Sequence, residues 1–208
     1  MNRVASATVV TTAMVDAAFR DAATGAMPPA KDRFRKGDFV VYPSHGVGRV
    51  DQVGVVEVAG HRLNVVQISF AENAMVLRIP VVKAAGAGLR KLAGPDVLAH
   101  AMTTLQGRPR ISRLMWAKRA QEYQAKINSG DPNALAEVVR DLQAASDGSS
   151  SFSQRNLFEL ALDRLAAEFA AASNIDKATA VSRITEAMQQ ARRTVAAQAS
   201  AAAAKDAD

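Results

Sequence analysis

Between residues 34 and 92, apolar residues recur at every second position over short runs, which is the pattern of β-strands. Two valine-rich runs flank the turn sequence Ala59-Gly60 and predict a hairpin. In residues 75–79, Met, Leu and Ile alternate with Val and Arg, which predicts a further strand. Several short strands separated by glycines predict a small, strongly bent antiparallel sheet or barrel.

In the second half of the chain the apolar period changes from two residues to that of an α-helix. One helix is predicted to begin at Pro132, behind Asp131 as its N-cap. Another has an apolar face in residues 158–169. Ser173, with Asp176 three residues later, resembles a capping box and predicts the start of a last helix.

These patterns predict an α+β protein in which a small antiparallel β-barrel domain precedes an all-helical domain. We place the sheet domain at 31–92, a linker region at 93–110 and the helical domain at 111–190. Residues 1–30 are expected to form a disordered or weakly helical extension, with a targeting segment as the alternative. The Ala-rich tail at 191–208 is expected to be flexible, either as a fraying helix or as disordered chain.

The charge of the 208-residue chain favours a polyanionic partner, because its net charge is +6. Residues 31–92 hold ten basic and five acidic residues, and six basic residues accompany Glu122 alone in 108–126. The chain contains no cysteine, which excludes disulfides, thiolate metal sites and cysteine nucleophiles and fits a reducing cytoplasm. No stretch is apolar and long enough to predict a membrane helix.

No set of residues in the sequence predicts catalysis. Ser44 and His45 are neighbours on an extended segment, so their side chains are expected to point to opposite faces and to serve a turn. The sequence Gly46-Val47-Gly48 lacks the lysine and hydroxyl residue of a P-loop and precedes no helix. The remaining histidines and carboxylates are scattered, so we expect a protein that is not an enzyme and uses no metal or cofactor.

One candidate binding surface lies on the predicted sheet. Arg78 lies between Leu77 and Ile79, so its side chain faces outward if those two face the core. An outward guanidinium can pair with a carboxylate of a partner protein, although a merely solvated charge is the more common case. Arg35 and Lys36, just before the first strand, extend the basic character of this domain.

A second candidate surface surrounds Trp116, the single tryptophan of the chain, which lies in its densest basic segment. Basic side chains bind a phosphate backbone, and an indole can insert at a base step. However, Ala120, Tyr123 and Ile127 follow at helical spacing, as on a buried face. The pattern alone favours a core position for the indole.

Two separate stretches of the chain resemble the CarD/CdnL family of bacterial RNA polymerase-binding transcription regulators. Residues 34–48, Phe-Arg-Lys-Gly-Asp-Phe-Val-Val-Tyr-Pro-Ser-His-Gly-Val-Gly, are similar to the opening of that family, which the transcription-repair coupling factor shares. Trp116, Ser-Gly-Asp-Pro at 129–132 and Ala-Glu-Val-Val-Arg-Asp-Leu at 136–142 resemble the helical domain of CarD proteins. The resemblance spans about 34–188.

The resemblance implies a Tudor-like domain that docks on the RNA polymerase β subunit and a helical domain that contacts promoter DNA at the upstream edge of the transcription bubble. In that family a tryptophan wedges into the minor groove and slows collapse of the bubble, and Trp116 matches its position. This implication replaces the core assignment that the pattern alone favours. Lys118 and Arg119 match basic residues that support the DNA contact.

On the sheet domain, Arg78 matches an arginine that the family uses against polymerase, and we assign Arg35 and Lys36 to the same surface. The chain departs from the family where Val56 replaces a second such arginine and Gln121 replaces a further DNA-facing arginine. We infer that other basic residues share the DNA contact, and these are Arg108, Arg110 and Arg113.

Other classes of binding protein stay open on sequence grounds. A basic Tudor- or KOW-like module could bind RNA or ribosomes, and a protein–protein adaptor could keep Trp116 buried. The favoured interpretation is a monomeric cytoplasmic regulator, since no heptad seam is evident. It is expected to have no membrane partner and to contact DNA largely without sequence specificity, because phosphate contacts and a wedge carry little base information.

Overall fold

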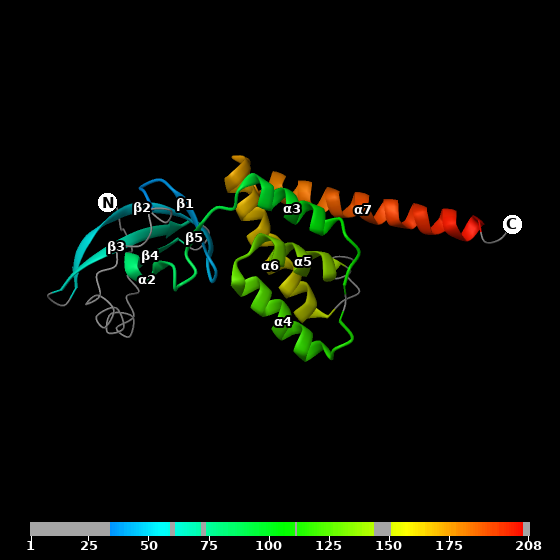
Figure 1. Cartoon of the computed structure of the whole chain (residues 1–208), viewed down its shortest axis with the longest axis horizontal. Helices are drawn as coiled ribbons and strands as arrows, with labels where there is room; N and C mark the ends of the chain where they lie inside the picture. Colours follow the sequence, from blue (N-terminus) through cyan, green and yellow to red (C-terminus); the bar gives the residue numbers. More distant parts are fainter. Residues whose placement is uncertain (1–33, 59–60, 72–73, 111, 144–150, 206–208) are drawn as a thin grey trace, which may run out of the picture. The chain divides into compact units, whose positions relative to one another are not determined.

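The computed structural model describes residues 34–58, 61–71, 74–110, 112–143 and 151–205, with only the backbone described at 58, 61 and 195–205. The predicted extension at 1–30 lies outside these residues. The chain divides into two units, 1–92 and 93–208, which are described separately below (Figure 1).

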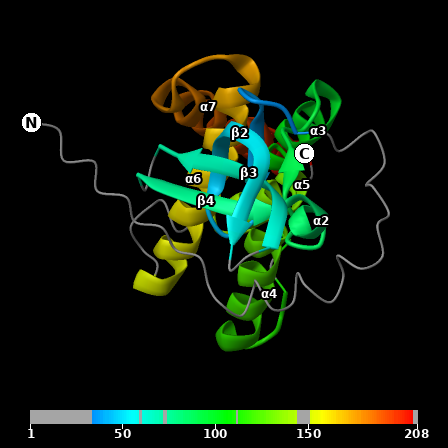
Figure 2. The same ribbon diagram turned by 90° about the vertical axis from the view of Figure 1, so that its left-hand side faces the viewer.

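The sheet unit contains five antiparallel strands in the order β4-β3-β2-β1-β5. The long strands β2 and β3 form a curved hairpin, which is drawn toward the viewer in Figure 2. A short helix, α2, follows β4. The bounds are β1 Phe39–Tyr42, β2 Gly46–Val58, β3 His61–Phe70, β4 Met75–Pro80, α2 Val81–Ala84 and β5 Arg90–Lys91.

Side chains on one face of the sheet form its core, as the alternating pattern predicts. The buried members include Val40, Val50, Val66, Ile68 and Phe70. Gly48 permits close packing in this core, because a Cβ atom there would lie only 2.6 Å from the Ile68 side chain. A residue with a side chain at position 48 would therefore force the Ile68 and Phe70 side chains to move.

In its described residues, the helical unit contains five helices packed around one apolar core. Helix α5 is central, since it packs against α3, α4 and α6 and seven of its ten residues are buried. The bounds are α3 Pro95–Leu105, α4 Trp116–Ser129, α5 Pro132–Asp141, α6 Phe152–Ser173 and α7 Lys177–Lys205. The sheet and the helices that follow it confirm the predicted α+β class.

Helix termini agree with the sequence in part. The Asp131 side chain caps α5 by accepting from the backbone amides of Asn133 and Ala134, as predicted. The predicted capping box at Ser173 is wrong, because Ser173 is the last residue of α6. Asp176 itself accepts from the Thr179 amide at 2.8 Å at the start of α7.

Two predicted boundary segments contain helix. Residues 93–110, assigned to a linker, hold α3, whose Ala101 and Leu105 are buried in the helical core. Proline at the first position favours this helix start, as it does in α5. Helix α7 continues through Lys205 into the tail assigned to 191–208, and residues 206–208 lie outside the described part.

Candidate functional site

Arg78 lies on the exposed face of β4. Leu77 packs toward the sheet core, so strand alternation directs Arg78 outward as predicted. The Arg78 Nε donates to Gln67 Oε1 at 3.0 Å on β3, and Gln52 on β2 donates to the same oxygen at 3.4 Å. The three residues form a polar row across adjacent strands, which fixes the direction of the guanidinium.

Arg35 and Lys36 are exposed in the turn before β1, and two strands, β2 and β3, lie between β1 and β4 in the sheet order. The turn is closed by the Arg35 amide, which donates to Asp38 Oδ2 at 3.0 Å, and Asp38 pairs with Lys91 at 3.1 Å. Partial burial opposes ionisation, but the Arg35 amide and Lys91 outweigh it and lower the pKa of Asp38. The two cations therefore sit on a defined turn and not on the Arg78 row.

Trp116 is the first residue of α4 and is half-buried against the helical core. Its ring centroid lies 6.5 Å from that of Tyr123, and its Nε1 donates to Ser153 Oγ at 3.1 Å. Tyr123 and Ile127 are buried, so the core pattern is correct for them and applies to the tryptophan only in part. The indole is therefore partly buried against the core and partly exposed.

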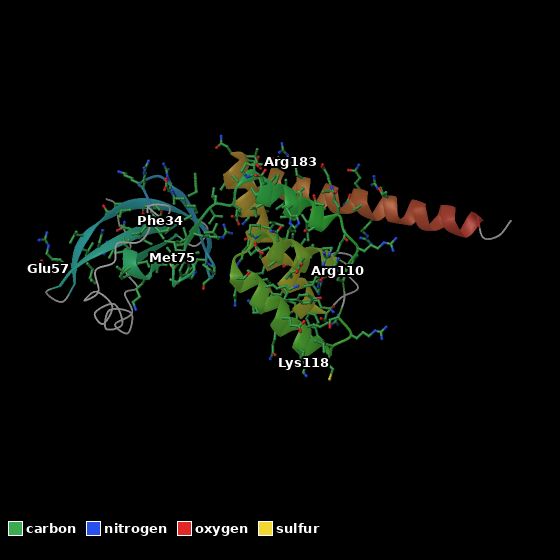
Figure 3. All side chains as sticks on the ribbon, in the orientation of Figure 1. Phe34, Glu57, Met75, Arg110, Lys118 and Arg183 are labelled. Atoms are coloured by element: carbon green, nitrogen blue, oxygen red, sulfur yellow. The ribbon has the colours of Figure 1, made fainter. Side chains whose placement is uncertain are left out.

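Two basic residues of the first turn of α4 take different positions. The Arg119 guanidinium carbon lies 5.5 Å from the Trp116 ring centroid, in cation–π contact. Its Nε is buried and has no hydrogen-bond partner among the described residues. Lys118, labelled in Figure 3, is exposed at the start of α4. Of these two predicted DNA-contacting residues, Arg119 lies over the indole and Lys118 faces solvent.

The segment that leads from α3 into α4 carries further cations. Arg108, Arg110 and Arg113 are all exposed, and Figure 3 shows Arg110 on this connection. The segment is fixed to the core by the Arg110 amide, which donates to Asp141 Oδ1 at 2.8 Å. All six predicted DNA-contacting residues therefore belong to α4 or to the segment that leads into it.

Several residues of this end of the helical unit are absent from the sequence prediction. Met115, next to Trp116, is 80% exposed, and Phe152 at the start of α6 is 78% exposed. The position of Met115 beside the tryptophan is a signal that could have identified it. Ser153 and Asp141 carry no local signal, because each reaches this site only through tertiary structure.

Ser44 and His45 lie in the turn between β1 and β2, as expected. The His45 ring stacks on Tyr42, with centroids 5.5 Å apart, and lies 5.6 Å from Phe70. Within the described ranges, no three His, Cys, Asp or Glu side chains are grouped so as to hold a metal ion. None of the helices described is long and apolar enough to span a bilayer.

Comparison with known proteins identifies both units. Residues 34–93 match the CarD-like/TRCF RID domain and residues 100–185 match the CarD C-terminal domain. The chain is 30% identical over 109 residues to the putative transcription factor YdeB of Bacillus subtilis, which covers 52% of this chain and 71% of that protein.

Among solved structures, the 72-residue N-terminal domain of Myxococcus xanthus CarD is 39% identical and covers 32% of this chain and 92% of that domain, with a TM-score of 0.25. The sheet unit and its match to the CarD-like/TRCF RID domain confirm the expected Tudor-like domain before the helices. With both of its domains matched in order, the chain belongs to the CarD/CdnL family of RNA polymerase-interacting transcription regulators.

Proposed function

We propose that this protein binds the β subunit of RNA polymerase through its sheet unit and stabilises the promoter open complex through Trp116. The observation that carries the proposal is the indole at the start of α4, half-buried and in contact with Arg119, among exposed basic residues. The basic residues assigned to DNA are Lys118, Arg119, Arg108, Arg110 and Arg113. The residues assigned to polymerase are Arg78, Arg35 and Lys36.

The indole is suited to insertion at a base step because contacts within its own domain already restrict its motion. Contact with Tyr123 and the hydrogen bond to Ser153 limit the motion of Trp116, so little ordering is required when DNA arrives. Cations near the ring bind phosphates on either side of the opened base step. Insertion of an apolar ring between base steps unstacks them, which opposes reannealing of the upstream edge.

The two-unit arrangement explains how a weak DNA contact becomes effective. Once the sheet unit is bound to polymerase, the DNA contact is intramolecular and benefits from a high effective concentration. Phosphate contacts specify no sequence, so the factor acts on many promoters and prefers steps that unstack easily. On this proposal the protein is a monomer in the cytoplasm, performs no catalysis and needs no cofactor.

Open-complex lifetime tests the wedge. Polymerase holoenzyme, promoter DNA and full-length protein are combined, a competitor is added, and the decay of the complex is followed with wild type and with Trp116→Ala. We expect the substitution to shorten the lifetime while the protein still binds polymerase. An unchanged lifetime would contradict the wedge.

Co-purification tests the docking surface. Arg78→Glu reverses a charge on the polar row of the sheet and should reduce recovery of polymerase. Arg62→Glu makes the same change at another exposed arginine of the sheet unit and should leave recovery near wild type. Equal recovery with both variants would refute the Arg78 assignment. Enrichment of ribosomal proteins in place of polymerase subunits would support the RNA-binding alternative.

A further inference from the structure

A buried ion pair lies at the end of α5. Arg140 and Asp141 are each 6% exposed, and the Arg140 Nε and Nη2 atoms both lie 2.8 Å from Asp141 Oδ1. Removal of two charges from water is costly, and buried ion pairs are often no more stabilising than apolar residues of the same size. Stability alone therefore does not account for the pair.

The pair contacts the basic segment at two points. The Arg110 amide donates to the same Asp141 oxygen at 2.8 Å, across 31 positions of sequence. Gly107 passes close to Arg140, because a Cβ atom there would lie 3.6 Å from Arg140 Cδ. Arg140 orients the carboxylate, and the carboxylate holds the backbone at Arg110.

The carboxylate also acts on the tyrosine that packs against the tryptophan. Burial first and the Asp141 charge second raise the pKa of the Tyr123 hydroxyl. Tyr123 in turn supports the Trp116 ring. Asp141 thus accepts from the backbone of the arginine-bearing segment and acts electrostatically on Tyr123, the ring that packs against Trp116.

We propose that Arg140 and Asp141 are positioning residues that hold the backbone at Gly107 and Arg110 against the helical core, so that the arginines of this stretch, Arg108, Arg110 and Arg113, are presented from a fixed backbone before DNA binds. This inference rests on the proposed function, because it concerns the same DNA-contacting surface. Fixing the backbone beforehand removes part of the ordering cost of each arginine. Neither residue of the pair contacts DNA.

Asp141→Asn in the full-length chain is the first test, since it keeps the shape of the side chain and removes its charge. We expect amide hydrogen exchange at Arg110, followed by NMR, to accelerate by about tenfold or more, because a hydrogen bond to a charged group is weakened. Exchange at Ile127, a buried residue of α4, measures any loss of global stability caused by the uncompensated Arg140 charge, and the acceleration at Arg110 should exceed the acceleration at Ile127. Asp163→Asn, at the exposed ion pair with Lys177, is the matched control and should change neither rate.

DNA affinity is the second readout, measured by fluorescence anisotropy with a short forked duplex. Asp141→Asn should weaken binding by about twofold to tenfold, as expected when ordered side chains become mobile. In a variant in which Arg108, Arg110 and Arg113 are all alanine, the same substitution should have no further effect, because the pair acts through those side chains.

A second pair of variants keeps the test decisive if Asp141→Asn does not fold. Arg110→Ala and Arg110→Pro both remove the guanidinium, but only proline also removes the amide that donates to Asp141. The proline variant should bind the forked duplex more weakly than the alanine variant. Equal affinities would overturn the positioning role.

Other results separate this inference from the proposed function. Wild-type exchange at Arg110 in Asp141→Asn would overturn the positioning role, and so would equal acceleration at Arg110 and Ile127, since the pair would then serve stability alone. Wild-type DNA affinity of the triple alanine variant would instead contradict the proposed role of the arginines, whatever the exchange rates show.

Discussion

The two candidate surfaces differ in how their functional side chains are held. On the sheet unit, Arg78 is exposed and its hydrogen bond to Gln67 lies at the surface. On the helical unit, Trp116 is half-buried and its surroundings are connected to the core through Tyr123 and Asp141. The residues of the first surface can change with little effect on folding, whereas those of the second contribute to both folding and function.

The same substitution at two arginines gives the largest expected contrast. Arg140→Met leaves Asp141 buried without its cation, which should reduce the free energy of unfolding by about 3–5 kcal/mol. Arg78→Met removes an exposed charge and should change the free energy of unfolding by no more than about 0.5 kcal/mol. Urea denaturation followed by circular dichroism measures both values. Similar losses of unfolding free energy in the two variants would show that the two surfaces do not differ in how much they contribute to folding.

Replacing the Trp116 side chain with a smaller one should reduce the free energy of unfolding by an intermediate amount. Trp116→Ala removes a half-buried ring from the edge of the core, so we expect a loss of about 1–2 kcal/mol in unfolding free energy. Trp116→Phe retains an aromatic ring beside Tyr123 and should lose less. Urea titrations of the two variants beside wild type provide the measurement. A loss near zero for alanine would mean that the ring is free and not supported by the core.

The hydrogen bond from the indole to Ser153 should contribute less than the ring itself. Ser153→Ala removes the acceptor, with an expected cost of about 0.5–1.5 kcal/mol. Trp116 is the single tryptophan, so its emission reports this change directly, and we expect a red shift as the indole becomes more mobile and hydrated. Ser112→Ala alters an exposed serine of the preceding segment and is expected to leave the emission unchanged.

The smallest effect concerns acid stability. The hydrogen bond from Lys126 holds the pKa of Glu137 below its usual value of 4.5. A lowered carboxyl pKa stabilises the fold above pH 4.5, and this contribution is lost as the pH falls through the folded-state pKa. Both side chains are 38% exposed, so screening keeps the contribution below about 1 kcal/mol.

The free energy of unfolding of Glu137→Gln should therefore fall slightly less than that of wild type when the pH is lowered from neutral to acidic. Urea midpoints at about pH 6 and about pH 3, which lie on either side of the glutamate titration, measure the difference. A wild type that is no more acid-sensitive than the variant would show that the ion pair makes no net contribution.

Local patterns were sufficient for much of the fold. Alternation placed Leu77 inside and Arg78 outside, and the Asp131-Pro132 signal marked the start of α5. These features depend on neighbours in sequence, where strand and helix periods apply. The segment 93–110 was assigned to a linker although it contains α3, whose short apolar face gains its stability from packing on α5.

Other features of the site depend on tertiary contacts. Arg140 and Asp141 are adjacent charged residues, which the sequence gives no reason to bury, yet α5 is enclosed by three other helices. The hydrogen bond between Trp116 and Ser153 joins residues 37 positions apart, so no local pattern could identify it. The orientation of the indole is set by such distant partners and not by the residues beside it in the sequence.

The central claim is that Trp116 acts on the melted edge of promoter DNA while the sheet unit holds polymerase. The most direct test compares open-complex lifetimes with wild type and Trp116→Ala on a fully paired promoter and on the same promoter with a mismatched, permanently open bubble. We predict a lifetime shortened about fivefold or more on the paired template, because contact of a base with an aromatic ring contributes about 1–3 kcal/mol. On the open template the two proteins should behave alike, and equal lifetimes on the paired promoter would contradict the claim.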